Sequence, residues 1–221
     1  MIQVIIISSL AALLSIVIQV SPMLKHKVIL RRLYASAVLI IPCFFSFYGS
    51  HWSSYAAINS GDVRSTIMYT AIFSLLVVLV NIKAGKQSEN TKMYPQIRTP
   101  RWTLLLFAMN GLSWIVYLTA YEFLFRGYVF TSLLQSTTVE NAFIISIVLY
   151  ALAHLYKDEK EFLLSIPFGF ILCYITLVTE NVWASIIIHS ALAISNDIFA
   201  LRANPFFSIS FLASKRLRYE K

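Results

Sequence analysis

Four ionisable side chains lie inside strongly apolar stretches of this chain. Glu122 and Arg126 are four positions apart, and two single histidines, His154 and His189, follow in two later apolar segments. An ionisable group in hydrocarbon costs from about 2.5 to more than 10 kcal/mol, so each of these residues marks a candidate functional site. A carboxylate with two imidazoles can activate a water molecule and stabilise an oxyanion, as the hydrolysis of a peptide bond requires.

The same residue types offer a second chemistry. Two histidines and a glutamate can bind zinc, although the His-Glu-x-x-His spacing of zinc peptidases does not occur here. Cys43 and Cys173 form neither a disulfide framework nor a metal-binding pattern. We therefore expect no metal and no other cofactor, and zinc stays as the alternative.

Each residue also has a purely structural interpretation. Glu122 and Arg126 face one another on a helix and could be only an ion pair, and a single histidine in an apolar helix often packs with its nitrogen bonded. The tyrosines of these segments could pack in the same way: Tyr117, Tyr121, Tyr128 and Tyr150. Counted at 1.5 Å per residue from the outer helix ends, Glu122 and His154 lie about 18 Å deep and His189 about 11 Å. The similar depths favour one polar site.

The composition is that of a membrane protein. Of the 221 residues, 58% are hydrophobic, and the mean hydropathy is +0.73, whereas soluble domains are about 45–50% apolar. The net charge of +8 comes from cations in short connections and in the tail, so we expect no binding of nucleic acid.

Seven apolar stretches approach the roughly 20 residues that a membrane-spanning helix needs. They are 2–20, 33–50, 65–83, 103–134, 142–156, 162–178 and 182–200. The first lacks the basic start of a signal peptide, so we expect a retained helix. The fourth would be about 48 Å long, and we expect it to enter at the membrane interface near Trp102 or to break around Asn110 and Gly111.

Basic residues gather in alternate connections. They follow the first helix, follow the third helix and occupy the tail: Lys25, Lys27, Arg31, Arg32; Lys83, Lys86, Lys92, Arg98, Arg101; Lys215, Arg216, Arg218 and Lys221. The other connections carry few cations, with Asp62, Arg64, Glu140 and Glu180 as their charged residues. Because connections rich in Lys and Arg stay in the cytoplasm, we predict an all-α, polytopic membrane helix bundle. It has about seven transmembrane helices, an outer N-terminus and a cytoplasmic C-terminus.

Three short motifs occur in order within residues 103–200. The first is Tyr121-Glu122-x-x-x-Arg126-Gly127 and the second is Tyr150-x-x-x-His154; the third begins at His189, after Pro167-Phe168-Gly169-Phe170 and Trp183-Ala184. Together they resemble the CAAX-protease and bacteriocin-processing family of intramembrane glutamic proteases, often called Abi proteins. The motifs of that family are Glu-Glu-x-x-x-Arg, Phe-x-x-x-His and His-x-x-x-Asn or Asp.

The chain departs from these motifs at two positions. Tyr121 replaces the first glutamate of the pair, and Ala193 replaces the Asn or Asp that follows the last histidine. Asn196 and Asp197 come one turn later. Seven residues at 100° each bring Asn196 to within about 20° of His189, so Asn196 could supply the missing polar group.

The resemblance implies an intramembrane endopeptidase that cuts a peptide or protein substrate at the lipid bilayer without a metal. It implies that Glu122 and His154 activate water, that His189 and Asn196 stabilise the oxyanion, and that Arg126 orients Glu122. The residues expected to support this site are Tyr121, Tyr150 and Asp197. We expect three N-terminal helices in 1–101, the catalytic core in 102–201 and a basic cytoplasmic tail in 202–221, in the plasma membrane of a prokaryote.

Two other functions are compatible with the sequence. Because Tyr121 and Ala193 stand where the chemistry needs polar groups, the chain could be an inactive member of the family that acts as a membrane scaffold or binding protein. A small transporter also places ionisable groups at mid-membrane, although neither a duplicated half nor paired broken helices is evident.

Overall fold

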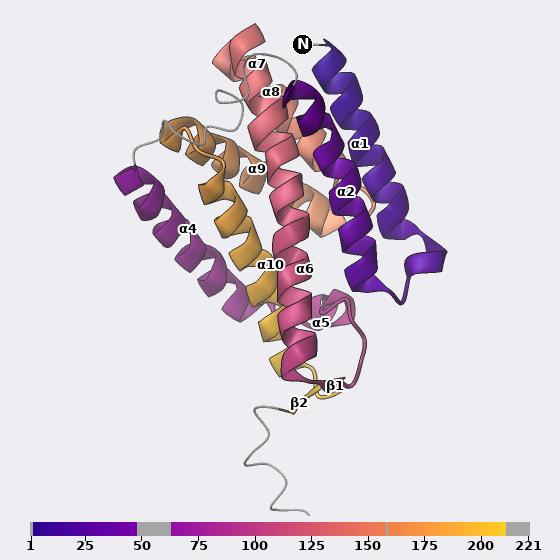
Figure 1. Ribbon diagram of the computed structural model, residues 1–221. Coiled ribbons are helices and arrows are strands. Elements are labelled where there is room, and N and C mark those ends of the chain that lie inside the picture. The colour runs from indigo at the N-terminus through magenta and orange to yellow at the C-terminus, as the bar shows by residue number, and fades with distance from the viewer. Residues whose placement is uncertain (1, 48–62, 158, 211–221) are drawn as a thin grey trace, which may run out of the picture.

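The computed structural model describes residues 2–47, 63–157 and 159–210, which form a bundle of helices with two very short strands (Figure 1). The elements in chain order are α1 (Ile2–Val20), η1 (Pro22–Leu24), α2 (Val28–Phe47), α4 (Val63–Ala84), α5 (Ser88–Met93), β1 (Arg101–Trp102), α6 (Leu104–Glu122), the π-helix η2 (Phe123–Phe130), α7 (Thr131–Ser136), α8 (Val139–Leu152), α9 (Glu159–Thr179), α10 (Trp183–Ala203) and β2 (Ser208–Ile209). The two strands pair in parallel, with Arg101 opposite Ser208. The predicted helical bundle is confirmed.

The first helix shows why this bundle belongs in a membrane. Its buried face is small or polar, consisting of Ser8, Ala11, Ser15 and Gln19, while large side chains such as Leu13 face outward at 57% exposure. In lipid, helices associate through small residues that allow close packing, and large apolar residues can face the acyl chains. The sequence of α1 therefore folds with its large apolar side chains on the outside.

Five helices of the described residues are long and apolar enough to cross a membrane: Ile2–Val20, Val63–Ala84, Leu104–Ser136, Glu159–Thr179 and Trp183–Ala203. The predicted span 142–156 corresponds to α8, which has 14 residues, and the predicted span 33–50 overlaps α2. The chain is a membrane helix bundle, and the exact number of seven crossings stays a prediction.

The predicted connections are only partly described. Figure 1 places the N-terminal end of α1 and the helix α7 at one end of the bundle, and α5, β1 and β2 at the opposite end. Within the described residues, the basic connections 21–27 and 85–100 point toward the end that carries α5, which we call the basic end. Asp62, residues 48–50 and the tail cations Lys215, Arg216, Arg218 and Lys221 lie outside the described residues.

Two local predictions are wrong. Arg31 and Arg32 do not lie in the connection after α1 but within α2, and Arg32 is 1% exposed because side chains of α6 satisfy its guanidinium. The helix α6 also runs unbroken through Asn110 and Gly111. A single glycine costs only about 1 kcal/mol in a helix relative to alanine, so the helix continues through Gly111. Trp102 lies just before α6, in β1, and is fully buried; the predicted interfacial entry near it stays a prediction.

The helix α6 changes its geometry about three turns later than predicted. Thr103 caps its start by accepting a hydrogen bond from the Leu106 amide at 3.2 Å, and its α-helical part ends at Glu122, where η2 takes over. The predicted pair of Glu122 and Arg126 therefore spans the junction between an α-helix and a π-helix. Such wider turns occur frequently at functional sites.

A further correction concerns His154. The sequence predicts it inside a helix over 142–156, whereas α8 ends at Leu152 and His154 lies in the turn that follows. A helix of 14 residues is about 21 Å long, which is shorter than the roughly 30 Å hydrocarbon core. The residues after Leu152 would complete the span as non-helical backbone, which is tolerated at membrane depth where it lines a cavity inside the protein.

Candidate active site

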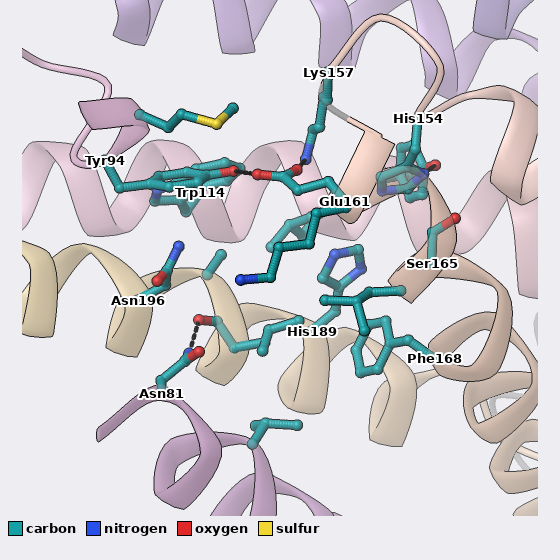
Figure 2. A pocket seen from close by; sticks show the side chains of 18 of the residues that line it. Asn81, Tyr94, Trp114, His154, Lys157, Glu161, Ser165, Phe168, His189 and Asn196 are labelled. Carbon is teal, nitrogen blue, oxygen red and sulfur yellow. Dashed lines mark hydrogen bonds and ion pairs between the residues drawn. The ribbon is translucent and has the colours of Figure 1, made fainter. Parts of the chain in front are cut away.

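A pocket of about 430 Å³ lies inside the bundle, between α4, α6, α9, α10 and the segment around α5. Figure 2 shows His154 and His189, which come from different elements, both at this pocket. Its lining also includes three of the other predicted site residues, namely Tyr121, Tyr150 and Asn196. The structure thus brings together residues from the three motifs.

Tyr121 lies between the two histidines. Its ring centroid is 6.0 Å from that of His154 and 5.9 Å from that of His189, and both contacts are edge-on. The Tyr121 hydroxyl is 3.4 Å from His154 Nδ1. The position that holds a carboxylate in the motif of the resembled family therefore holds a phenol that faces both imidazoles.

The orientation of His154 is set by the end of α8. Its Nδ1 lies 2.9 Å from the carbonyl oxygen of Tyr150, and a carbonyl can only accept, so the Nδ1–H form donates this hydrogen bond. The ring also lies 4.7 Å from the ring of Tyr150. In this tautomer the Nε2 atom carries the lone pair and can act as a base.

Glu122 is fully buried and contacts His189 rather than His154. Its Oε1 is 2.6 Å from His189 Nδ1, and its Oε2 is 3.2 Å from Arg126 Nη1. Both Glu122 and Arg126 are 0% exposed and lie outside the set of described residues that line the pocket. The carboxylate therefore stands one layer behind the pocket and holds the histidine that faces it.

Arg126 is fixed from three sides. Besides Glu122, its Nη2 donates to the carbonyl oxygen of Gly169 at 3.3 Å, and its guanidinium lies 4.0 Å from the centroid of the Tyr150 ring. A side chain at Gly169 would come within 2.9 Å of Tyr150. A glycine is therefore needed here for α9 to pack against Tyr150.

Asn196 and Asp197 are the two candidates for the third motif, and their side chains point to different places in the structure. Asn196 lines the pocket, and its Oδ1 accepts a hydrogen bond from Asn90 at 3.0 Å. Asp197 is 1% exposed and accepts instead from Asn110 at 2.9 Å and from Trp114 at 2.7 Å. Asp197 thus belongs to a second buried cluster and does not line the pocket.

One carboxylate that lines the pocket, Glu161, is not among the predicted site residues. Glu161 accepts a hydrogen bond from the Tyr94 hydroxyl at 2.5 Å and lies 2.6 Å from Lys157 Nζ, as the dashed lines in Figure 2 show. Burial raises the pKa of Tyr94, so its hydroxyl stays protonated and donates. The i,i+4 spacing of Lys157 and Glu161 was the available signal, but such pairs are common on solvated helix ends.

The described residues contain no group of three His, Cys, Asp or Glu side chains placed to hold a metal ion. The Nδ1 atoms of both histidines already have partners within the protein, namely the Tyr150 carbonyl and the Glu122 carboxylate. The arrangement is suited to acid–base chemistry at the two Nε2 atoms.

Comparison with known proteins finds one family that resembles part of this chain. Residues 100–195 match the family described as type II CAAX prenyl endopeptidase Rce1-like. This segment of the chain is similar to that family. The relationship that the three motifs indicated is thereby confirmed. Neither the curated proteins nor the solved structures contain a match to the chain.

The Rce1-like segment contains the Glu122–Arg126 pair, His154 and His189. Asn196 follows directly after its end, and Arg32 and Tyr94, which also line the pocket, precede it. With several helices able to cross a membrane, the chain is an integral membrane protein, and its residues 100–195 are similar to an endopeptidase family.

Proposed function

We propose that this protein is an intramembrane endopeptidase that hydrolyses a peptide or protein substrate in the pocket between Tyr121, His154 and His189. The observation that carries the proposal is the presence of two imidazoles from separate elements at one pocket, each with its Nδ1 held by a protein acceptor. The Rce1-like match of residues 100–195 supports a peptide bond as the target.

His154 is the proposed general base. Its Nδ1–H is held by the Tyr150 carbonyl, so its Nε2 lone pair takes a proton from water while the water oxygen attacks the peptide carbonyl carbon. The same proton then passes from His154 to the nitrogen of the leaving amine as the peptide bond breaks. General acid–base catalysis of this kind contributes about 10²–10⁴-fold.

His189 is the proposed oxyanion donor. The Glu122 carboxylate, 2.6 Å from Nδ1, stabilises the protonated ring, whose Nε2–H can donate to the developing oxyanion. The side-chain amide of Asn196 is the second proposed donor. Glu122 then acts through His189 instead of on the water, and Arg126 holds Glu122 in place.

We propose seven crossings, an outer N-terminus and a cytoplasmic basic end, in the plasma membrane of a prokaryote. The support is the concentration of cations in the connections at the basic end, since such connections stay in the cytoplasm. The polar residues of the pocket that lie nearest this end, such as Asn90 and Lys160, then face the cytoplasm.

The full chain in proteoliposomes, incubated with a library of quenched fluorescent peptides, tests the activity. We expect His154→Gln and His189→Gln each to lower kcat/KM at least 100-fold. The exposed His26 supplies the matched control, His26→Gln, which should cleave at the wild-type rate. Full activity of either pocket variant would overturn the assignment.

A second candidate function is a membrane scaffold or binding protein without peptidase activity. The specific observations are that Tyr121 stands where a carboxylate is expected and that Glu122 is fully buried behind the pocket. Tyr121→Glu would restore the pair of carboxylates, and Tyr117→Glu, one turn earlier on the same helix, is its matched control. Cleavage by Tyr121→Glu alone, with none by the wild type, would favour the scaffold.

A further inference from the structure

The segment from Gln87 to Gln96, which we call the strap, forms the wall of the pocket at the basic end. It consists of the six-residue helix α5 and the residues around it. Four of its side chains line the pocket: Asn90, Met93, Tyr94 and Gln96. The strap precedes the Rce1-like segment of residues 100–195, so the match itself assigns it no role.

Polar side chains tie the strap to the helices of the site. Asn90 donates to Asn196 of α10 at 3.0 Å, and Tyr94 donates to Glu161 of α9 at 2.5 Å. Figure 2 shows Tyr94 directed at Glu161 across the pocket wall. These two bonds connect the strap to the helix that carries His189 and to the helix that follows His154.

Further hydrogen bonds hold the strap, among them one from Asn204, the C-cap of α10, to the Thr91 carbonyl oxygen at 3.4 Å. Gln96 accepts hydrogen bonds from Arg31 at 3.1 Å and from Arg32 at 3.2 Å, both on α2. At the other end of the strap, Lys160 donates to Gln87 at 2.9 Å. The strap is therefore fastened by side-chain hydrogen bonds to three different helices, α2, α9 and α10.

Apolar packing of the strap involves few residues, and Tyr94 is the one that belongs to the main hydrophobic core among the described residues. Tyr94 and Pro95 are its buried residues among those described, whereas Met93 is 37% exposed. A segment held mainly by exposed or half-buried hydrogen bonds opens at a lower free energy than a packed helix, and lids over active sites are drawn from such segments.

We propose that the strap is a lid that closes the basic end of the pocket, and that a peptide substrate enters from the aqueous side by displacing it. The identity of the entering molecule as a substrate rests on the proposed peptidase function, while closure can be measured without any substrate. Displacement breaks the Asn90–Asn196 bond, so opening of the strap also releases the side chain proposed to donate to the oxyanion.

The test measures how fast a sulfonated, membrane-impermeant maleimide labels Ala193→Cys, a position that lines the pocket one turn after His189. The full chain is held in nanodiscs, where both aqueous faces are open. We expect slow labelling of Ala193→Cys with the strap intact, compared with the exposed position Asn141→Cys. Adding Tyr94→Phe and Gln96→Ala should raise the rate about tenfold, because the closed state then lacks the Tyr94–Glu161 bond and the two bonds that Gln96 accepts.

Matched controls use residues of the same types away from the strap. Tyr34→Phe on α2 and Gln135→Ala on α7 are both exposed and should leave the labelling rate unchanged. The native Cys43 and Cys173 are buried, and in chains that keep Ala193 they report any loosening of the bundle. If Cys43 or Cys173 becomes labelled when Tyr94→Phe and Gln96→Ala are combined, the bundle has loosened. The labelling rate of Ala193→Cys is then compared with and without Tyr94→Phe alone.

Two results would overturn the proposal. One is labelling of Ala193→Cys with the intact strap at the rate of Asn141→Cys, which would mean that the pocket is already open. The other is fast labelling by a lipid-soluble maleimide together with no effect of the strap variants on the impermeant reagent, which would assign access to the bilayer side. Neither result depends on peptidase activity, so failure here is distinguishable from failure of the proposed function.

Discussion

Two buried arginines, Arg126 and Arg32, solve the same physical problem in different ways. They are 0% and 1% exposed, and each guanidinium lies over an aromatic ring, at 4.0 Å from the centroid of Tyr150 and 3.6 Å from that of Trp114. Such contacts are favourable when the cation is desolvated, yet they do not neutralise its charge. Each arginine therefore needs a carboxylate nearby.

Arg126 contacts its carboxylate, Glu122, directly, whereas Arg32 is linked to Asp197 through Asn110. Arg126 lies 3.2 Å from Glu122 on the same helical stretch. Arg32 donates to Asn110 Oδ1 at 2.9 Å, and Asn110 in turn donates to Asp197 at 2.9 Å. The first cluster is a direct pair within five consecutive helical residues, and the second is a relay that links α2, α6 and α10.

The two arrangements differ in what they hold in place. The direct pair holds His189 at the pocket, whereas the relay joins an N-terminal helix to the core and leaves Arg32 lining the basic end of the pocket. Removing one member of a buried pair is expected to cost more than weakening a relay, because the remaining charge then has no compensation at close range.

The largest effect is expected for Glu122→Gln. The substitution keeps the shape of the side chain but leaves the Arg126 charge uncompensated, so the free energy of unfolding should fall by about 3–5 kcal/mol. Unfolding in mixed micelles with increasing SDS measures this. Glu180→Gln, at an exposed carboxylate, is the control and should change it by less than about 0.5 kcal/mol. A variant as stable as the wild type but inactive would instead place Glu122 directly in the chemistry.

Asp197→Asn should have the next largest effect. Asp197 accepts two hydrogen bonds, from Asn110 and Trp114, and bonds to a charged group contribute about 1.5–3 kcal/mol. Asn retains one acceptor oxygen, so we expect a loss of about 2 kcal/mol in the same SDS titration. A loss as large as that of Glu122→Gln would contradict the contrast between relay and direct pair.

Replacing the direct pair with apolar residues should cost less than breaking it. Buried ion pairs can often be exchanged for packed hydrophobic side chains at little cost, so Glu122→Leu combined with Arg126→Met should unfold within about 1–2 kcal/mol of the wild type. Cleavage should nevertheless be lost, because His189 then lacks its carboxylate partner. Retained cleavage would show that the pair has a structural role alone.

The smallest effect is expected at the cations that do lie in connections. Lys25 is exposed, so Lys25→Gln should change the free energy of unfolding by less than about 0.5 kcal/mol. Arg32→Gln, which removes a buried cation from the relay, should be clearly less stable than Lys25→Gln in a parallel titration. Equal stability of the two variants would contradict the assigned importance of the relay.

Much of the candidate site could be predicted from the sequence because its key interactions are local. The i,i+4 spacing of Glu122 and Arg126 predicts their contact on one helical face, and a histidine in an apolar stretch predicts a polar partner. The three motifs also indicated the Rce1-like family, which residues 100–195 match. The membrane bundle followed from the length and apolar character of the helices.

Other parts could not be predicted in this way. Arg32 was assigned to a connection because it follows other cations, yet its partners Asn110 and Ser113 lie 78 and 81 positions away. Glu122 meets His189 over 67 positions, and Tyr94 meets Glu161 over another 67. Patterns of neighbouring residues carry no information about such pairings.

The sequence by itself determined the helices, their apolar faces and the close pair on one of them, since these depend on side chains within one or two turns. Only the tertiary structure decided that Glu122 contacts His189, that Asp197 does not line the pocket and that the strap lines its basic end. The physical reason is that a buried polar group must find its partner wherever packing places one. In a bundle, that partner usually belongs to another helix.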